Sequence, residues 1–361
     1  MKKIDWYILK HYLVTFLFTL LILIPIAIAI DVSEKIDKFL YHDDLGLGQV
    51  LNEYYKNFTI YYANTFMPLA VFIAVILFTS KLSNNTEIIA ITNAKISFSR
   101  FLYPYFIGAT IVTIIALGMN HFIVPKSSKI RNKFEKKYID RQTSKDRYVK
   151  EFSLQLSDST YMFMHSFDME RNQGYFFSIE VYDGLELKTK LITDNIKWNI
   201  KDSTYTLTNY KIRRIYKDRD SIFLGTRLDT TFSFTPKDLM YKSALSQQMP
   251  SDELLDFINI SKKRGVKNLN SYLVEFHKRT SLPISTYILT IIAVALSYKK
   301  RRGGTGINLA IGVGIMFLYI FFLKISEVLG AVAGVNSFLY VWFPNLFFTI
   351  LAVLLYNHAR K

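Results

Sequence analysis

The chain has 361 residues, of which 50% are hydrophobic, 16% aromatic and 20% charged. A chain this apolar can bury enough surface to offset its ordering entropy, so its composition excludes an intrinsically disordered protein. Because the chain contains no cysteine, disulfide-stapled domains, thiolate metal sites and cysteine nucleophiles are excluded as well. Its 45 lysines and arginines against 29 aspartates and glutamates give a net charge of +16, which favours an anionic partner, either nucleic acid or lipid.

Six apolar runs along the chain are each long enough to cross a membrane as a helix. They hold about 17 to 24 residues each, enough to span a hydrocarbon core of about 30 Å. None of the runs shows a polar face at helical period, so buried helices of a soluble protein are a poor interpretation. The runs are residues 13–30, 58–79, 101–124, 282–298, 307–323 and 338–356.

The short connections between these runs indicate the orientation. Basic residues gather before the first run, between the second and third, between the fourth and fifth, and after the sixth. The positive-inside rule therefore predicts that both termini lie in the cytoplasm and that residues 126–281 lie on the opposite side. The basic residues are Lys2, Lys3, Lys10, Lys81, Lys95, Arg100, Lys299, Lys300, Arg301, Arg302, Arg360 and Lys361.

The block between the third and fourth runs has a different pattern. From about residue 150 to residue 235, short segments of strand composition alternate with turn signals such as Asp183-Gly184. The last two of these segments, residues 222–224 and 226–234, have Gly225 between them. About eight short strands at this spacing suggest an antiparallel sandwich or jelly roll, and imperfect alternation leaves the strand order open. Ser251 then predicts the N-cap of a helix that Gly265 closes.

These observations predict an α-helical membrane protein with six transmembrane helices in a 3+3 arrangement and an inserted antiparallel β jelly-roll-like domain. We expect residues 1–125 to hold the first three helices, residues 126–281 to form the β domain with a helical tail, and residues 282–361 to hold the last three.

The sequence contains no recognisable catalytic constellation. It has no GxxxxGK[ST] phosphate loop, no HExxH zinc motif and no GxSxG nucleophile elbow. Its six histidines are scattered without metal-ligand spacing. We therefore expect no catalytic residue, no metal site and no cofactor.

Charged residues near the ends of two runs are candidates for a substrate contact. Lys324 and Glu327 follow the fifth run, three residues apart and so on one helix face. They fit either a self-paired couple or a Lys324 that contacts an anionic substrate group. Lys35 and Lys38, among acidic residues after the first run, fit either a solvated helix end or the same substrate contact.

The connection between the second and third runs predicts a short amphipathic helix under the membrane. Glu87, Ile88 and Ala94 belong to it, and the pattern places it near residues 84–97. Such an interfacial helix is either a surface anchor or a socket for a soluble partner, and the pattern alone leaves both open.

Several segments in fixed order resemble the LptF/LptG permeases of the lipopolysaccharide export transporter, over essentially the whole chain. In one position the sequence departs from the family, because Lys95 stands where the coupling helix usually ends in glycine. The segments are Ile4-Asp5-Trp6-Tyr7-Ile8-Leu9-Lys10, Ile36-Asp37-Lys38-Phe39, Glu87-Ile88-Ile89-Ala90 with Ala94 and Ile96-Ser97, His277-Lys278-Arg279, Arg301-Arg302-Gly303-Gly304 and Trp342-Phe343-Pro344-Asn345.

The resemblance implies a multi-pass inner-membrane permease subunit of an ABC transporter, and no enzyme. A second LptF/LptG-type permease would pair with it above a cytoplasmic ABC ATPase dimer supplied by another chain. Lipopolysaccharide would enter between the first and fifth spans of facing subunits and leave through the periplasmic β domain to a jelly-roll bridge protein. No nucleic acid is then needed to explain the positive charge.

The same resemblance assigns residues to roles. Glu87, Ile88, Ala94 and Lys95 would couple to the ATPase. The charged residues at the helix ends, Lys35, Lys38, Lys324 and Glu327, remain the candidates for contact with the lipid, and Lys324 and Glu327 match no pattern of the family. A membrane-embedded enzyme that modifies envelope lipids and an envelope assembly scaffold are the alternatives. The sequence leaves F-like or G-like identity, homo- or hetero-pairing and headgroup specificity open.

Overall fold

The computed structural model describes residues 2–42, 45–139, 148–200, 202–216, 219–236, 243–263, 266, 269–300 and 304–360. The chain divides into two compact units. Residues 1–139, 246–254 and 270–361 form a helical unit, and residues 140–245 and 255–269 form the unit that holds the β-strands. Arg301, Arg302 and Gly303 of the fourth connection, and Gly265, lie outside the described residues.

Six helical spans within the described residues are long and apolar enough to cross a membrane, which confirms the six spans expected from the sequence. The second and third spans each contain a π-helical turn, η1 and η2. The spans are α1 (Lys3–Leu40); α2 (Leu47–Gln49) with η1 (Val50–Tyr55) and α3 (Lys56–Asn84); α5 (Phe98–Gly118) with η2 (Met119–Ile123) and α6 (Val124–Tyr138); α10 (Asn270–Ser297); α11 (Gly304–Gly330); and α12 (Ser337–Arg360).

The first span extends well beyond its apolar run. With 38 residues, α1 is about 57 Å long at 1.5 Å per residue, whereas a hydrocarbon core is about 30 Å thick. The charged residues from Asp31 to Lys38 therefore lie on a continuous helix. In the same way, α5 continues through η2 into the polar helix α6.

Helices α3 and α10 form the centre of the helical unit. α3 packs against α1, α10 and α11, and α10 also packs against α5 and α12. Phe72 and Val75 of α3 and Leu289 of α10 are fully buried in this core. In contrast, large apolar residues such as Leu17 of α1 and Phe317 of α11 are exposed, and lipid tails can solvate such faces.

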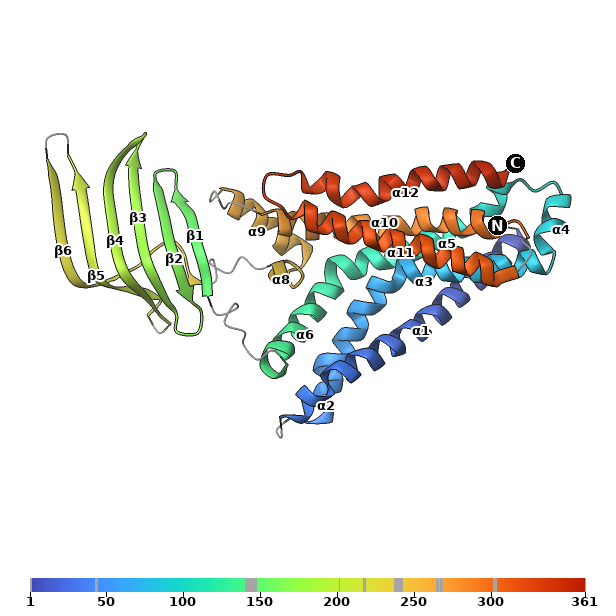
Figure 1. The fold of residues 1–361 in the computed structure, drawn as a ribbon, viewed down its shortest axis with the longest axis horizontal. Coiled ribbons are helices and arrows are strands. Elements are labelled where there is room, and N and C mark those ends of the chain that lie inside the picture. The colour runs from blue at the N-terminus through green and yellow to red at the C-terminus, as the bar shows by residue number, and fades with distance from the viewer. Residues whose placement is uncertain are drawn as a thin grey trace. The chain divides into compact units, whose positions relative to one another are not determined.

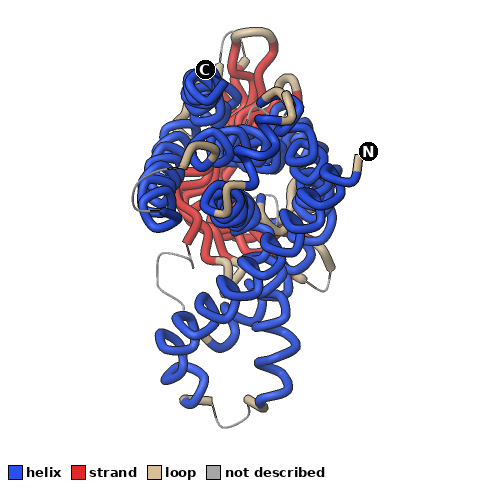
Figure 2. Tube along the Cα trace, turned by 90° about the vertical axis from the view of Figure 1, so that its right-hand side faces the viewer, coloured by secondary structure: helices blue, strands red, loops and turns tan. Residues whose placement is uncertain are grey.

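Both termini lie at the same end of the helical unit, beside the short helix α4 (Glu87–Asn93), as Figure 1 shows. Figure 2 looks onto that end. Basic side chains gather there: Lys300 Nζ donates to the Asn84 carbonyl at 3.3 Å, and Lys299 Nζ donates to the His358 carbonyl at 3.2 Å. The second and third spans have their π-helical turns toward the opposite end, where α2 lies (Figure 1).

The β unit contains one antiparallel sheet whose strands follow chain order, so its topology is an up-and-down meander. The strands are β1 (Tyr148–Ser157), β2 (Thr160–Asp168), β3 (Gln173–Asp183), β4 (Glu186–Asn199), β5 (Thr204–Ile215) and β6 (Asp220–Thr230). The inserted antiparallel β domain is thereby confirmed, and the strand order that the sequence left open is consecutive.

Among the described residues the sheet has six strands, where the sequence suggested about eight shorter ones. The expected break at Gly225 does not occur, since Gly225 pairs with Tyr210 in the middle of β6. A Cβ at Gly225 would lie only 2.4 Å from Cζ of the Tyr210 ring. The glycine therefore makes room for the tyrosine inside a strand and does not mark a turn.

One face of the sheet carries the core of the β unit. Met162 and Met164 of β2 are buried, while Tyr161 and Phe163, which alternate with them, are exposed, as a strand period of two requires. Phe177, Ile196 and Leu207 continue this core across β3, β4 and β5, and Phe232, Phe234 and Val266 pack against it.

On the surface, the Lys190 ammonium, 2.6 Å from Glu180, lowers the pKa of that carboxyl.

The expected tail helix begins at Ser251, as α9 (Ser251–Lys263), and follows the short helix α8 (Ser243–Ser246).

Candidate functional site

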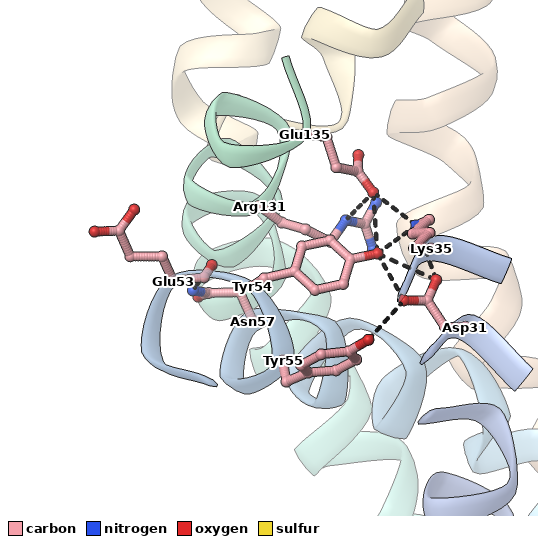
Figure 3. Close-up of polar contacts among 8 residues, drawn as sticks. All are labelled: Asp31, Lys35, Glu53, Tyr54, Tyr55, Asn57, Arg131 and Glu135. Carbon is pink, nitrogen blue, oxygen red and sulfur yellow. Dashed lines mark hydrogen bonds and ion pairs between the residues drawn. The ribbon is translucent and has the colours of Figure 1, made fainter. Parts of the chain in front are cut away.

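The C-terminal end of α1 carries a cluster of charged and hydroxyl groups, which Figure 3 shows. Asp31 and Lys35 lie one helical turn apart, with Lys35 Nζ 2.8 Å from Asp31 Oδ1. Lys35 Nζ is also 3.4 Å from Glu135 Oε1 on α6 and donates to the Tyr54 hydroxyl on η1. The Tyr54 hydroxyl lies 2.9 Å from Asp31 Oδ2. Lys35 is therefore held by two carboxylates and connects three helical segments.

The remaining contacts of this cluster balance its charge. Arg131 Nε lies 3.8 Å from Glu135 Oε1, and its guanidinium stacks 4.4 Å from the Tyr61 ring centroid. The Tyr55 hydroxyl reaches Asp31 Oδ2 at 3.5 Å. Two cations thus face two carboxylates among aromatic rings, so this part of the helix end is a packed contact between α1, η1 and α6.

Lys38, the second lysine expected to contact lipid from α1, has a different environment. It is exposed, and the structure shows no ion pair between it and another described residue. Lys35 is therefore paired with carboxylates of the chain, whereas Lys38 has no carboxylate partner among the described residues.

The C-terminal end of α11 carries a second charged cluster. Lys324 Nζ lies 2.9 Å from Glu327 Oε2, which is the self-paired arrangement weighed from the sequence. Lys278 Nζ of α10 lies 2.8 Å from Glu327 Oε1, so the carboxylate has two cationic partners. The Lys324 side chain is 65% exposed, against 24% for Lys278. Sequence reasoning missed Lys278 as a site residue, although its place in the basic triplet His277-Lys278-Arg279 was a signal.

The neighbouring Arg279 is a buried anchor. It is 3% exposed, and its guanidinium donates to the carbonyls of Ser246 and Met249 at 2.7 and 2.8 Å and to Ser251 Oγ at 2.8 Å. These three hydrogen bonds hold the segment before α10, and they leave few N–H groups of the guanidinium to bind a ligand.

A cavity of about 220 Å³ opens beside the second cluster. Lys278, Lys324 and Glu327 line it together with apolar residues of α3, α10 and α11, among them Leu69 and Met316. A wall that is charged in one part and apolar in the rest suits an amphiphilic molecule.

The two clusters do not come together within one chain. α1 packs mainly on α3 and α5, whereas α11 packs on α3, α10 and α12. Of the four residues expected to contact lipid, the structure therefore joins Lys324 with Glu327, while Lys35 belongs to a separate network.

The expected interfacial helix is α4. Ile88 is buried in the helical core, and the Glu87 carboxylate accepts a hydrogen bond from the Tyr7 hydroxyl at 3.1 Å. Ala94 caps the helix, and Lys95 follows with φ of +58°, in the left-handed region. This conformation favours glycine, the residue that the resemblance leads one to expect at this position.

Together these features define the class: a multi-pass helical membrane protein with an antiparallel β domain inserted between its third and fourth spans. Across the described residues, no group of three or more histidine, aspartate or glutamate side chains could hold a metal ion. The chain belongs to the LptF/LptG family, the lipopolysaccharide export system permeases, whose sequence model matches residues 6–358. A comparison with curated proteins finds no match.

Proposed function

We propose that this permease is the membrane subunit of an ABC transporter that extracts lipopolysaccharide from the inner membrane and passes it through its β domain toward the outer membrane. The observation that carries this proposal is the family match over residues 6–358, which covers both the helical spans and the β domain. The cavity with its charged and apolar walls, beside Lys324 and Glu327, is in keeping with an amphiphilic cargo.

In this proposal the end of the helical unit that holds both termini and α4 faces the cytoplasm. The basic residues gathered at that end support this orientation under the positive-inside rule. Residues 1–125 and 282–361 then form the transmembrane region, and residues 126–281 form the periplasmic region. The protein would lie in the inner membrane.

The partners in this proposal are those of the transporter. A cytoplasmic ABC ATPase dimer would dock on α4 through Glu87, Ile88, Ala94 and Lys95. Since Ile88 is buried, its part would be to fix α4 on the core, while Glu87 and Lys95 present polar groups. A second LptF/LptG-type permease and a periplasmic jelly-roll bridge protein would complete the assembly.

The lipid path would use the charged residues at the outer helix ends. Lipopolysaccharide carries phosphate groups, and contacts between ammonium groups and phosphate are among the stronger hydrogen bonds. Lys35, Lys38, Lys324 and Glu327 would contact it where α1 and α11 of facing subunits form the entrance. The exposed ammonium groups of Lys38 and Lys324 are the best placed of these for a new partner.

The test is purification of the tagged chain from its own cell envelope, followed by mass measurement of the intact assembly. We expect an ATPase dimer and a second permease, with lipopolysaccharide bound. After reconstitution into liposomes, ATP should move lipopolysaccharide to an added periplasmic acceptor. Assembly without an ATPase, or modification of the lipid by the chain alone, would replace this proposal with the scaffold or the enzyme.

A further inference from the structure

The motif Asp5-x-Tyr7 at the start of α1 has no role in the transport scheme above, yet both side chains make specific long-range contacts. Asp5 is 1% exposed, and its Oδ2 lies 2.6 Å from Arg100 Nη2 at the start of α5. The same oxygen accepts the backbone N–H of Lys2 at 2.7 Å, which caps α1. A buried carboxylate with a charged partner from another helix fixes the two helix ends to each other.

Tyr7 makes the corresponding contact with α4. Its hydroxyl donates to Glu87 Oε2 at 3.1 Å, and its ring packs edge-on against His11 with centroids 4.6 Å apart. The hydrogen bond orients the carboxylate that the proposed function assigns to the ATPase contact. Tyr7 is therefore placed to position Glu87.

The space between these elements is almost filled. The start of α1, the end of α4 and the start of α5 enclose a cavity of only about 30 Å³, lined by Ile4, Ile8 and Ile91 among others. That volume is about the share of one water molecule. Movement of α4 toward or away from α1 would require these side chains to repack, because close-packed contacts do not deform continuously.

Between its two ends, in contrast, most residues of α1 are not buried. In its most apolar window 11% of residues are buried, against 67% for the span Leu47–Asn84. It is fixed at its start by Asp5 and Tyr7 and at its outer end by Asp31 and Lys35. Because α1 is one continuous helix that is attached at both ends, a displacement of its start can be transmitted to its other end.

We propose that Asp5 and Tyr7 clamp α1 to α5 and α4, so that displacement of α4 moves α1 with it. The inference rests on the proposed function, in which α4 receives the ATPase and α1 borders the lipid entrance. Asp5 and Tyr7 are positioning residues in this scheme, and they contact neither nucleotide nor lipid. The motif is then the point at which the energy of ATP hydrolysis reaches the lipid entrance.

The first test measures coupling in the purified complex in liposomes, as lipopolysaccharide transferred per ATP hydrolysed. Asp5→Asn and Tyr7→Phe keep side-chain shape but remove one charge or one hydroxyl. We expect each variant to lower the ratio of lipopolysaccharide transferred to ATP hydrolysed about fivefold. This factor corresponds to the free energy of one hydrogen bond of ordinary strength, about 1 kcal/mol.

The matched control removes a different side-chain contact of α4, one that does not involve α1. The Thr92 and Tyr298 hydroxyls lie 3.2 Å apart, and this contact joins α4 to the end of α10. Tyr298→Phe should leave the coupling ratio within about twofold of wild type. This change is smaller than the factor that corresponds to one ordinary hydrogen bond. An unchanged ratio in Asp5→Asn and Tyr7→Phe, or an equal loss in Tyr298→Phe, would overturn the clamp.

The second test uses spin labels, for which the absence of cysteine leaves a clean background. Trp6 and Ile89 are 63% and 50% exposed and accept Trp6→Cys and Ile89→Cys. We expect one narrow distance distribution between them, identical in nucleotide-free and vanadate-trapped complexes, that broadens in Asp5→Asn and Tyr7→Phe. A distribution that is broad in the wild type, or one that the variants leave narrow, would contradict the clamp.

The two tests separate the clamp from the proposed function. The label distance is measured in the full chain alone as well as in the complex, so it reports on the clamp even where no ATPase binds. Transport by the wild-type complex reports on the proposed function. A narrow distribution that the variants broaden, in a chain without transport, would retain the clamp and reject the transporter.

Discussion

Lys278 on α10 lies 2.8 Å from Glu327 on α11, so a carboxylate that the sequence paired only with Lys324 has a second and more buried cationic partner. The contact joins two neighbouring spans at the wall of the cavity. Because Lys278 is three-quarters buried and Lys324 is two-thirds exposed, we expect Lys278 to stabilise the helix pair and Lys324 to exchange its partner more readily.

The difference in burial predicts that the two lysines contribute unequally to stability. Removing one partner of a buried pair leaves the other charge uncompensated, so Lys278→Ala should reduce the free energy of unfolding by about 3 kcal/mol. Lys324→Ala should cost less than about 1 kcal/mol, as for an exposed pair. Thermal unfolding of the purified protein in detergent measures both. Equal losses would show that the exposed and the buried lysine contribute alike.

The two lysines of α1 lead to a second prediction. Lys38→Ala should reduce the lipopolysaccharide that co-purifies with the complex severalfold, with an unchanged unfolding midpoint, because its charge has no partner among the described residues. Lys35→Ala should instead lower stability by about 2 kcal/mol, since Asp31 and Glu135 lose a hydrogen-bonded cation. Lys35→Arg is the control that retains the charge. A loss of bound lipid only in Lys35→Ala would reverse this assignment.

The sequence predicts those features of the structure that depend on residues close to one another in the chain. The six spans, the helix α4 and the start of α9 follow from local patterns: apolar length, amphipathic period and an N-cap. The pairing of Lys324 with Glu327 follows from helical spacing alone. These features depend on residues close in the chain, so a single sequence suffices to predict them.

Contacts between distant segments could not be predicted in that way. Nothing in the period of α1 indicates that Asp31 meets Tyr54 and that Lys35 meets Glu135, because periodicity defines a face and not its partner. The same holds for Asp5 with Arg100. At Gly225 the local signal was misleading, since the glycine accommodates the Tyr210 ring inside a strand where it resembled a turn.

Lys95 offers a third prediction, at the end of α4. A residue with a side chain in the left-handed region costs about 1 kcal/mol relative to glycine. With φ of +58° at this position, Lys95→Gly should stabilise the helix end by about that amount, partly offset by the greater freedom of glycine in the unfolded chain. Hydrogen exchange of the α4 amides should slow, whereas Lys95→Ala should not slow it. Faster exchange in Lys95→Gly would mean that the lysine side chain itself holds the helix end.

The close approach of α1 and α5 gives the last prediction. A Cβ at Gly108 of α5 would lie 2.3 Å from Cε1 of the Tyr12 ring, which is fully buried, whereas a Cβ at Gly118 of the same helix would meet nothing within 4 Å. Gly108→Ala should therefore displace Tyr12 and cost about 1–3 kcal/mol through overpacking. Gly118→Ala, the matched control, should be neutral or stabilise by up to about 1 kcal/mol, because alanine favours the helix. The unfolding midpoints of the two variants are measured in one detergent. Similar midpoints would show that α1 can shift away from α5 at no cost.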